Sequence, residues 1–250
     1  MEVHKHPHHV THKKKWTEYL LEFLMLFLAV FLGFVAENIR EHSVEKEREK
    51  QYMQSFVYDI QNDTANLNEG FPRKDGRIKA IDSVFLFFES NPGATIIPGF
   101  IARQMRRSLW DRHYRRNSTT IDQLKNAGGM RLIRNKNVAD SIAAYDLLWI
   151  RAEFWREGYI TLQEKGKDLV HKVIDATNLL SKYRMWEFIS KRNTLDSLSI
   201  KINRESLNEF LNFLADQKIT TSQDKDGYKT IEKMAERLIA LIKKEYHLQN

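Results

Sequence analysis

Residues 19–36, YLLEFLMLFLAVFLGFVA, decide how this chain is built. Seventeen of these eighteen residues are apolar or glycine, and the exception is Glu22. A helix of this length spans roughly 27 Å, close to the ~30 Å hydrocarbon core of a bilayer. Trp16, Tyr19 and the lysines at residues 13–15 suit the headgroup region in front of it. The stretch therefore predicts a membrane-spanning helix.

A cleaved secretory signal peptide is the alternative for this stretch. The apolar region of a signal peptide normally has ~7–15 residues and ends in small residues. Here the apolar run is longer, and Phe34 stands where a peptidase requires a small side chain. The sequence therefore favours an uncleaved anchor.

Glu22 lies about one helical turn inside the apolar run, where an ionised carboxylate is unfavourable unless it reaches headgroups, water or a partner. One interpretation is a functional intramembrane acid, either a proton relay or a contact with a cationic partner helix. The other is a carboxylate near the interface that extends toward Lys15 or is protonated. Because polar residues in membranes often lie at helix interfaces, we expect a homo-oligomer or a fixed complex with an envelope protein that involves Glu22.

The orientation of the span follows from the basic residues around it. Four lie before it and four follow it within fifteen residues, namely Lys5, Lys13, Lys14 and Lys15, then Arg40, Lys46, Arg48 and Lys50. The lysines at residues 13–15 adjoin the span without acids among them, whereas glutamates are interleaved with the later group. The positive-inside rule therefore predicts residues 1–18 in the cytoplasm and the bulk of the chain on the other side of the membrane.

Composition favours helices for the rest of the 250 residues. Four Pro, ten Gly and no long alternating run of β-branched residues predict an all-α fold, and the absence of Cys excludes disulfides and Cys-based zinc or redox sites. We expect a disordered His- and Lys-rich tail at 1–18, a transmembrane helix at 19–36, a polar helical stalk at 37–52 and an antiparallel helical bundle at 53–250.

The first fifteen residues hold five histidines: His4, His6, His8, His9 and His12. Histidines in a flexible segment are weak candidates for binding nickel, copper or zinc. Nothing fixes a coordination geometry, so a solvated basic tail is the simpler interpretation. No metal and no cofactor are predicted.

Glycine and proline divide the bundle into expected helices. Gly70, Phe71 and Pro72 are expected to end the helix that enters it, and the next helix is expected from about Lys74 to Ser90, where an Asn-Pro-Gly sequence stops it. A further helix is expected from Pro98 onward.

Arginines are concentrated after this point, at Arg103, Arg106, Arg107, Arg112, Arg115 and Arg116. Residues 103–136 hold ten Lys or Arg and two Asp, a balance of +8 that exceeds the +7 of the whole chain. The cluster is a candidate site for anionic lipid, a cell-wall polymer or an acidic partner, with nucleic acid an option only if the domain is cytoplasmic. The alternative is a solvated face whose arginines pair with acids of neighbouring helices.

Residues 118–146 predict two helices that meet at a tight corner. Ser118 is a natural N-cap, Gly128 or Gly129 suits the left-handed conformation that ends a helix, and Asn135 or Asn137 caps the next helix. Core positions are expected at Leu124, Met130, Leu132 and Ile133.

Three segments carry a resemblance to a known family: KKKWTEYLLEFLMLFLAVFLGFVAENIRE at 13–41, YMQSFVYDIQND at 52–63 and TTIDQLKNAGGMRLIRNKNVADSIAAYD at 119–146. With their surroundings, roughly residues 13–67 and 118–146, they resemble an uncharacterised domain-of-unknown-function family of single-span bacterial inner-membrane proteins. Members typically have Gly before the intramembrane acid and Asn with Trp after the span, where this chain has Leu21 and the Glu37-Asn38 pair. Together with the predicted orientation, the resemblance implies a helical domain anchored in a bacterial inner membrane with its bulk in the periplasm. It implies no activity.

The second half of the chain predicts a helix of about forty residues from Asn137, with an aromatic stripe that includes Trp149 and Trp155 in the core. Two closing helices are expected at about 203–216 and 228–246. The polar segment between them contains Asp224-Lys225-Asp226-Gly227, which lacks the ligands of a calcium loop and is expected to be a turn.

Function is the least determined property. No catalytic motif occurs, and the pair His113 and His171 has no acid or nucleophile at a telling spacing, so we expect no enzyme. The leading hypothesis is a membrane-anchored interaction or assembly module. A sensor domain that signals through a partner is the alternative, and a binder of anionic lipid or polymer through the arginine cluster is the third.

Overall fold

The structure is a computed structural model that describes residues 15–111, 113–126, 128–175 and 198–249. The chain forms two compact units, Met1–Lys50 and Gln51–Asn250. The described residues form five α-helices, one 3-10 helix and two short strands, so the predicted all-α class is confirmed. In chain order the elements are α1 (Trp16–Ser90), β1 (Ile96–Pro98), α2 (Gly99–Arg107), α3 (Thr119–Asn126), η1 (Gly129–Leu132), α4 (Lys136–Val173), β2 (Ser199–Lys201) and α7 (Arg204–Tyr246).

The first unit contains the N-terminal part of α1. All of residues 19–36 are helical and exposed, and this part of α1 is long and apolar enough to cross a membrane. Phe23, Phe27 and Phe31 stack at four-residue intervals along one side of it. The expected transmembrane helix is therefore compatible with the structure. Residues 1–14, which hold the histidines expected as weak metal ligands, lie outside the described residues.

The second unit begins with the remainder of α1, and the predicted break at residues 70–72 is wrong. The helix continues through Pro72 to Ser90. Pro72 is exposed, so its ring displaces no core side chain. Gly70 serves packing, because a Cβ there would lie 1.5 Å from the Tyr114 hydroxyl oxygen. The stop at Ser90 is confirmed, and the side-chain amide of Asn91 donates to Phe87 O at 2.9 Å.

The corner between α3 and α4 forms as predicted. α3 starts directly after Ser118, and Gly128 adopts the left-handed conformation with φ of 70°. The Asn135 side chain then caps α4 by accepting a hydrogen bond from Val138 N at 3.2 Å. Local capping chemistry determines this corner, which explains why it could be predicted from the sequence.

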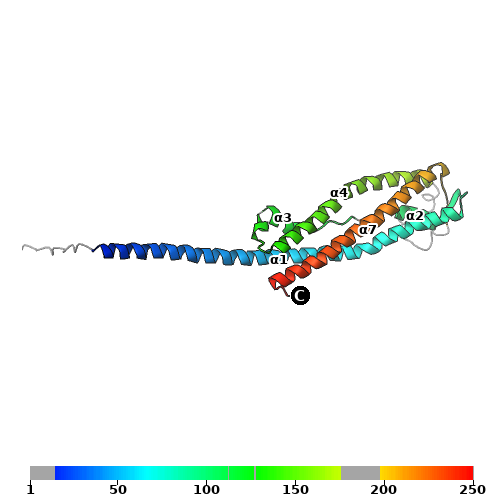
Figure 1. Ribbon diagram of the computed structural model, residues 1–250. Helices are drawn as coiled ribbons and strands as arrows, with labels where there is room; N and C mark the ends of the chain where they lie inside the picture. The colour runs from blue at the N-terminus through cyan, green and yellow to red at the C-terminus, as the bar shows by residue number, and fades with distance from the viewer. Residues whose placement is uncertain (1–14, 112, 127, 176–197, 250) are drawn as a thin grey trace, which may run out of the picture. The chain divides into compact units, whose positions relative to one another are not determined.

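The two long helices α4 and α7 lie side by side and run in opposite directions (Figure 1). α4 has 38 residues, close to the predicted forty. The prediction of two closing helices is wrong, because α7 is one helix of 43 residues that includes the expected turn at Asp224 to Gly227. Ion pairs with α1 fix this polar stretch, since Asp224 pairs with Lys74 and Lys225 pairs with Asp75.

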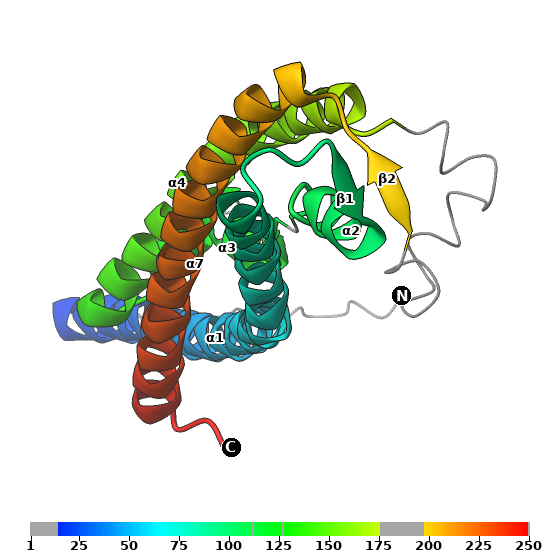
Figure 2. The ribbon, with the colours of Figure 1, turned by 90° about the vertical axis from the view of Figure 1, so that its right-hand side faces the viewer.

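A two-stranded antiparallel sheet was not predicted. Figure 2 shows β1 and β2 paired beside α2. Ile97 lies opposite Ile200 in the register, and both side chains are buried. Residues 176–197, between α4 and β2, lie outside the described residues.

The core of the second unit consists of two apolar clusters. One lies among residues 53–67 of α1, α3, the first half of α4 and the second half of α7. The other lies among the end of α1, α2, both strands, the end of α4 and the first half of α7. Between the two clusters, α1 and α7 contribute buried polar residues, and these form part of the site described next.

Candidate functional site

A buried polar layer separates the two apolar clusters. α1 contributes Lys74 and Arg77, the segment after α2 contributes Asp111, and α7 contributes Gln217, Thr221 and Asp224. The side chains of Lys74 and Arg77 are 1% and 3% exposed. Buried charges of this kind require partners, because desolvation of an unpaired charge costs several kcal/mol.

Lys74 joins the two acids of the layer. Its Nζ donates to Asp111 Oδ1 at 3.1 Å and to Asp224 Oδ2, which also form its ion pairs. Nζ lies 5.4 Å from the ring centroid of Tyr228 and 5.8 Å from that of Tyr114, within the range of cation–π attraction. The ammonium is therefore held by two carboxylates and two aromatic rings.

Arg77 satisfies its guanidinium within the same layer. Nε donates to Ser108 O at 2.7 Å, Nη1 donates to Asp111 Oδ2 at 2.9 Å and to Thr221 Oγ1 at 2.8 Å, and Nη2 donates to Gln217 Oε1 at 2.7 Å. Burial lowers the pKa of Arg77, and Asp111 opposes that effect. Burial also raises the pKa of Asp224, which Lys74 opposes. Two cations and two carboxylates balance the charge of the layer.

Asp111, His113 and Asp224 come close enough to suggest a metal site. One ligand atom of each lies within 4.8 Å of the others. Both ring nitrogens of His113 are buried without a hydrogen-bond partner among the described residues, and burial lowers its pKa. However, Lys74 already bridges the two carboxylates, so a divalent cation would have to displace an ammonium beside Arg77. The layer is better understood as balanced by its own side chains.

The grouping of His113 with Asp111 and Asp224 was not predicted, because His113 was expected to have no acid at a spacing that indicates a site. Asp111 precedes His113 by two residues, which is the one local signal in the sequence. Asp224 is 150 residues from Lys74, and nothing in the sequence marked that pair. His171 takes no part in the cluster.

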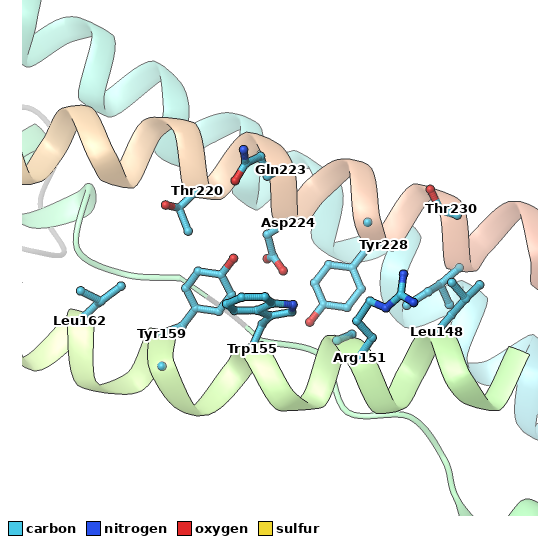
Figure 3. A pocket seen from close by; sticks show the side chains of 14 residues that line it. Leu148, Arg151, Trp155, Tyr159, Leu162, Thr220, Gln223, Asp224, Tyr228 and Thr230 are labelled. Atoms are coloured by element: carbon cyan, nitrogen blue, oxygen red, sulfur yellow. The ribbon is translucent and has the colours of Figure 1, made fainter.

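A cavity of about 680 Å³ opens between α4 and α7 beside the polar layer. Its lining includes Trp155, Tyr159 and Leu162 from α4 and Thr220, Asp224 and Tyr228 from α7. Figure 3 shows Trp155 between Tyr159 and Tyr228, with Asp224 extending toward these rings from α7. The prediction that Trp155 is a core residue is wrong, because it is 60% exposed and lines this cavity, whereas Trp149 is 1% exposed and lies in the core as predicted.

A second acid pair, Asp59 and Asp63 on α1, orders the start of α3. Asp59 accepts from Asn117 Nδ2 at 2.7 Å and from Thr120 N at 3.0 Å. Asp63 accepts from Asn117 N at 2.7 Å and from the Tyr145 hydroxyl at 3.3 Å. Burial raises the pKa of Asp63 to about 6. These contacts join two of the segments on which the family resemblance rests, and their role is structural.

The described arginines of the expected anion site lie on α2 and in the segment that follows it. Arg103, Arg106 and Arg107 lie on α2, Arg115 is exposed in the following segment, and Arg112 lies outside the described residues. The Arg116 side chain is 8% exposed and pairs with Asp146, which Lys125 also contacts at 2.9 Å. Burial alone would raise the pKa of Asp146, but the hydrogen bonds from Arg116 and Lys125 lower it. Arg116 therefore fits the alternative expectation, in which arginines of this segment pair with acids of neighbouring helices.

An exposed apolar face runs along α4. Leu147, Ile150 and Phe154 are 55%, 44% and 74% exposed and are spaced three and four residues apart. This spacing places them in one stripe on the helix. The Phe154 ring lies edge-on to Trp155 with centroids 5.5 Å apart, so the stripe extends toward the cavity. Glu22, the expected intramembrane acid, is exposed on the part of α1 in the first unit.

Comparisons with known proteins add no assignment. No family model matches the chain, and no curated protein or solved structure is significantly similar to it.

Proposed function

We propose that this protein is a non-catalytic, membrane-anchored helical module that assembles with a second copy of itself through the α4 stripe, Leu147, Ile150 and Phe154. The observation that carries the proposal is the exposure of these three large side chains on one face of a helix in a folded unit. The proposed setting is a bacterial inner membrane, in keeping with the helix at 19–36 and the family resemblance of residues 13–67 and 118–146.

Physical arguments favour a helix as the occupant of the stripe. Side chains three and four residues apart form a ridge that fits between the side chains of another helix. Burial of each large apolar side chain contributes about 1.5–3 kcal/mol, enough in total to favour association of molecules already confined to one membrane. A two-fold pair of α4 helices would bury the same stripe on both copies, as closed homodimers do.

The absence of cysteine allows a direct test by disulfide crosslinking. A single Leu147→Cys substitution reports on proximity of two α4 stripes in membranes under oxidising conditions. Leu86→Cys is the matched control, because Leu86 is 63% exposed on α1. We expect a crosslinked dimer with Leu147→Cys and little with Leu86→Cys. Equal crosslinking of the two variants, or crosslinking of Leu147→Cys to another protein alone, would refute self-assembly through α4.

The proposed orientation places residues 37–250 outside the cytoplasm. It is supported by the acid-free lysines at residues 13–15 beside the span. An alkaline phosphatase fused after residue 250 should be active, and a fluorescent protein that folds only in the cytosol should be dark at the same position. The reverse pattern would reject this orientation and would restore nucleic acid as a possible partner of the exposed arginines.

A sensor domain is the second candidate, and the cavity between α4 and α7 favours it. Its volume of about 680 Å³ lies in the range of sites for small organic molecules. Asp224 on the cavity wall pairs with Lys74 on α1, the helix that also contains residues 19–36. A ligand that altered this pair would act on a side chain of α1.

A further inference from the structure

We propose that the cavity between α4 and α7 binds a planar, uncharged aromatic molecule that carries an N–H donor, with its ring against Trp155 and its donor on Asp224. This inference is independent of assembly through the α4 stripe. It supplies the ligand that the sensor candidate requires.

Aromatic rings form the wall on which the ligand would stack. Trp155, Tyr159 and Tyr228 all line the cavity, and Trp155 is 60% exposed (Figure 3). His113 stacks on the Tyr159 ring with ring centroids 5.1 Å apart, which holds this ring in place. A flat aromatic ligand gains from offset or edge contacts with such rings in addition to the area that it buries. The wall therefore favours a planar ring over an alkyl chain.

Two glycines keep the cavity open from both sides. Gly158 of α4 and Gly227 of α7 line it, and a Cβ at either position would meet no atom within 4 Å. In contrast, a Cβ at Gly70, Gly76 or Gly166 would collide with a neighbouring side chain. Neither Gly158 nor Gly227 has a positive φ. Glycine inside a helix costs about 1 kcal/mol relative to alanine. Neither packing nor backbone geometry requires these glycines, and a large side chain at either position would take up part of the cavity.

Asp224 determines the polar part of the ligand. Its Oδ2 accepts from Lys74, and no hydrogen bond to Oδ1 is present among the described residues. The carboxylate therefore offers one acceptor atom, which matches an N–H donor. Because Lys74 and Arg77 already balance Asp111 and Asp224, a ligand with its own positive charge would leave an excess of charge beside the buried layer. An uncharged donor leaves the balance intact.

Benzimidazole is a suitable probe, because it is planar, mainly uncharged at pH 8 and carries one N–H. Its 1-methyl derivative has the same ring without the donor. Benzyltrimethylammonium supplies a cationic aromatic comparison, and 1-hexanol supplies an alkyl chain. Binding is measured by ligand-observed NMR titration of the full chain in lipid nanodiscs, with empty nanodiscs as the reference for partition into lipid.

We expect benzimidazole to bind about tenfold more tightly than its 1-methyl derivative, since a hydrogen bond to a charged acceptor is lost. The cation and the alcohol should bind more weakly than benzimidazole. Tighter binding of either, equal binding of the methylated ring, or no saturable binding of benzimidazole would overturn the proposal.

Variants locate the site. Gly158→Leu fills the cavity and should abolish binding of benzimidazole, and Gly227→Leu provides the same test from α7. Trp155→Ala should weaken binding about tenfold through loss of ring contact. Trp110→Ala is the matched control, because Trp110 is 67% exposed and does not line the cavity. Thermal unfolding followed by circular dichroism verifies that each variant is folded. Undiminished binding by folded Gly158→Leu and Gly227→Leu would exclude this cavity, whatever the oligomeric state.

Discussion

Trp149 and Trp155 show how a single residue position decides between core and cavity. Trp149 packs among aromatic neighbours, with its ring centroid 6.5 Å from that of Tyr145 and 6.1 Å from that of Tyr228. Trp155 follows six residues later, and six residues turn an α-helix through 600°, so the two rings leave α4 about 120° apart. The apolar spacing along α4 grouped both residues in one stripe, but their separation along the helix places them on different faces.

The two tryptophans should therefore differ in their contribution to stability. Trp149→Ala leaves a cavity in a closed core and should lower the free energy of unfolding by about 3–5 kcal/mol. Trp155→Ala removes a ring that is already largely exposed and should lower it by less than about 1 kcal/mol. Urea unfolding followed by circular dichroism measures both. Similar losses for the two variants would contradict the placement of Trp155 on the cavity wall.

Lys74 provides a second test at the scale of one residue. Lys74→Met leaves Asp111 and Asp224 buried without the ammonium between them and should cost about 3–5 kcal/mol. Lys218 is the control, because it is 46% exposed and pairs with Asp82 at 2.6 Å near solvent. Lys218→Met should cost no more than about 1 kcal/mol. The same urea unfolding compares the two, and equal losses would show that Lys74 is not the centre of the polar layer.

Asp63 should make stability depend on pH. Its pKa of about 6 exceeds the ordinary value of 3.8, mainly through burial, with Asp59 raising it and Asn117, Tyr145 and Arg116 lowering it. The folded state thus binds this proton more tightly than the unfolded state, so ionisation of Asp63 opposes folding. This loss of stability is absent below about pH 4, grows as the pH rises and is complete above about pH 6.

Asp63→Asn should remove the destabilising ionisation, while the new amide oxygen still accepts the hydrogen bond from Asn117 N. We expect the variant to be more stable than the wild type by about 2 kcal/mol at pH 8, and the difference to shrink toward pH 4. Urea unfolding at pH 4, 6 and 8 measures it, with Asp140→Asn, an exposed position on α4, as the control. A difference between Asp63→Asn and the wild type that stays constant across this range would contradict the raised pKa.

At the scale of elements, the sequence identified helices whose ends depend on local chemistry. Caps, glycine and proline determine the end of α1 at Ser90, the corner from Ser118 to Asn135 and the length of α4. The interiors of α1 and α7 were misjudged, because partners distant in the sequence stabilise their breaking residues. Tyr114 packs on Gly70, and Lys74 pairs with Asp224. Such tertiary contacts override local propensity.

The strands were unpredictable for a related reason. β1 and β2 have three residues each, and Ile97 pairs with Ile200 across about a hundred positions of the chain. Runs this short carry no periodicity that separates them from loops. The α4–α7 cavity depends equally on long-range pairing, and Gly227 on its wall was expected in a turn instead.

Pro72 tests the continuity of α1. Inside a helix, proline removes a backbone hydrogen bond and its ring collides with a preceding carbonyl, which typically costs about 3 kcal/mol. Because Pro72 is exposed, Pro72→Ala loses no core packing and should raise the free energy of unfolding by about 1–3 kcal/mol. If a new helix began at this residue, as the sequence suggested, the substitution would be neutral or destabilising. Urea unfolding of the variant against the wild type distinguishes the two.

At the scale of the whole molecule, two apolar clusters enclose a charge-balanced layer in the second unit. Neither the layer nor the cavity was predicted, because the residues that form them come from α1, the segment after α2, α4 and α7. The sequence did predict the general organisation, in which an apolar helix precedes a helical bundle. The first unit adds one residue of functional interest, Glu22.

Glu22 offers a second contribution to the proposed assembly. If it contacts another helix within the membrane, Glu22→Leu should change the oligomeric state while the second unit stays folded. If it only reaches the headgroups, the substitution should leave the oligomeric state unchanged. This variant therefore separates assembly through the span from assembly through α4.

The mass of the full chain in lipid nanodiscs, measured by native mass spectrometry, tests the central proposal most directly. Assembly through α4 predicts a dimer for the wild type, a monomer for Phe154→Ser and a dimer for the control Leu86→Ser, whose exposed leucine lies on α1. A monomeric wild type, or a Phe154→Ser variant with the same oligomeric state as the wild type, would contradict it.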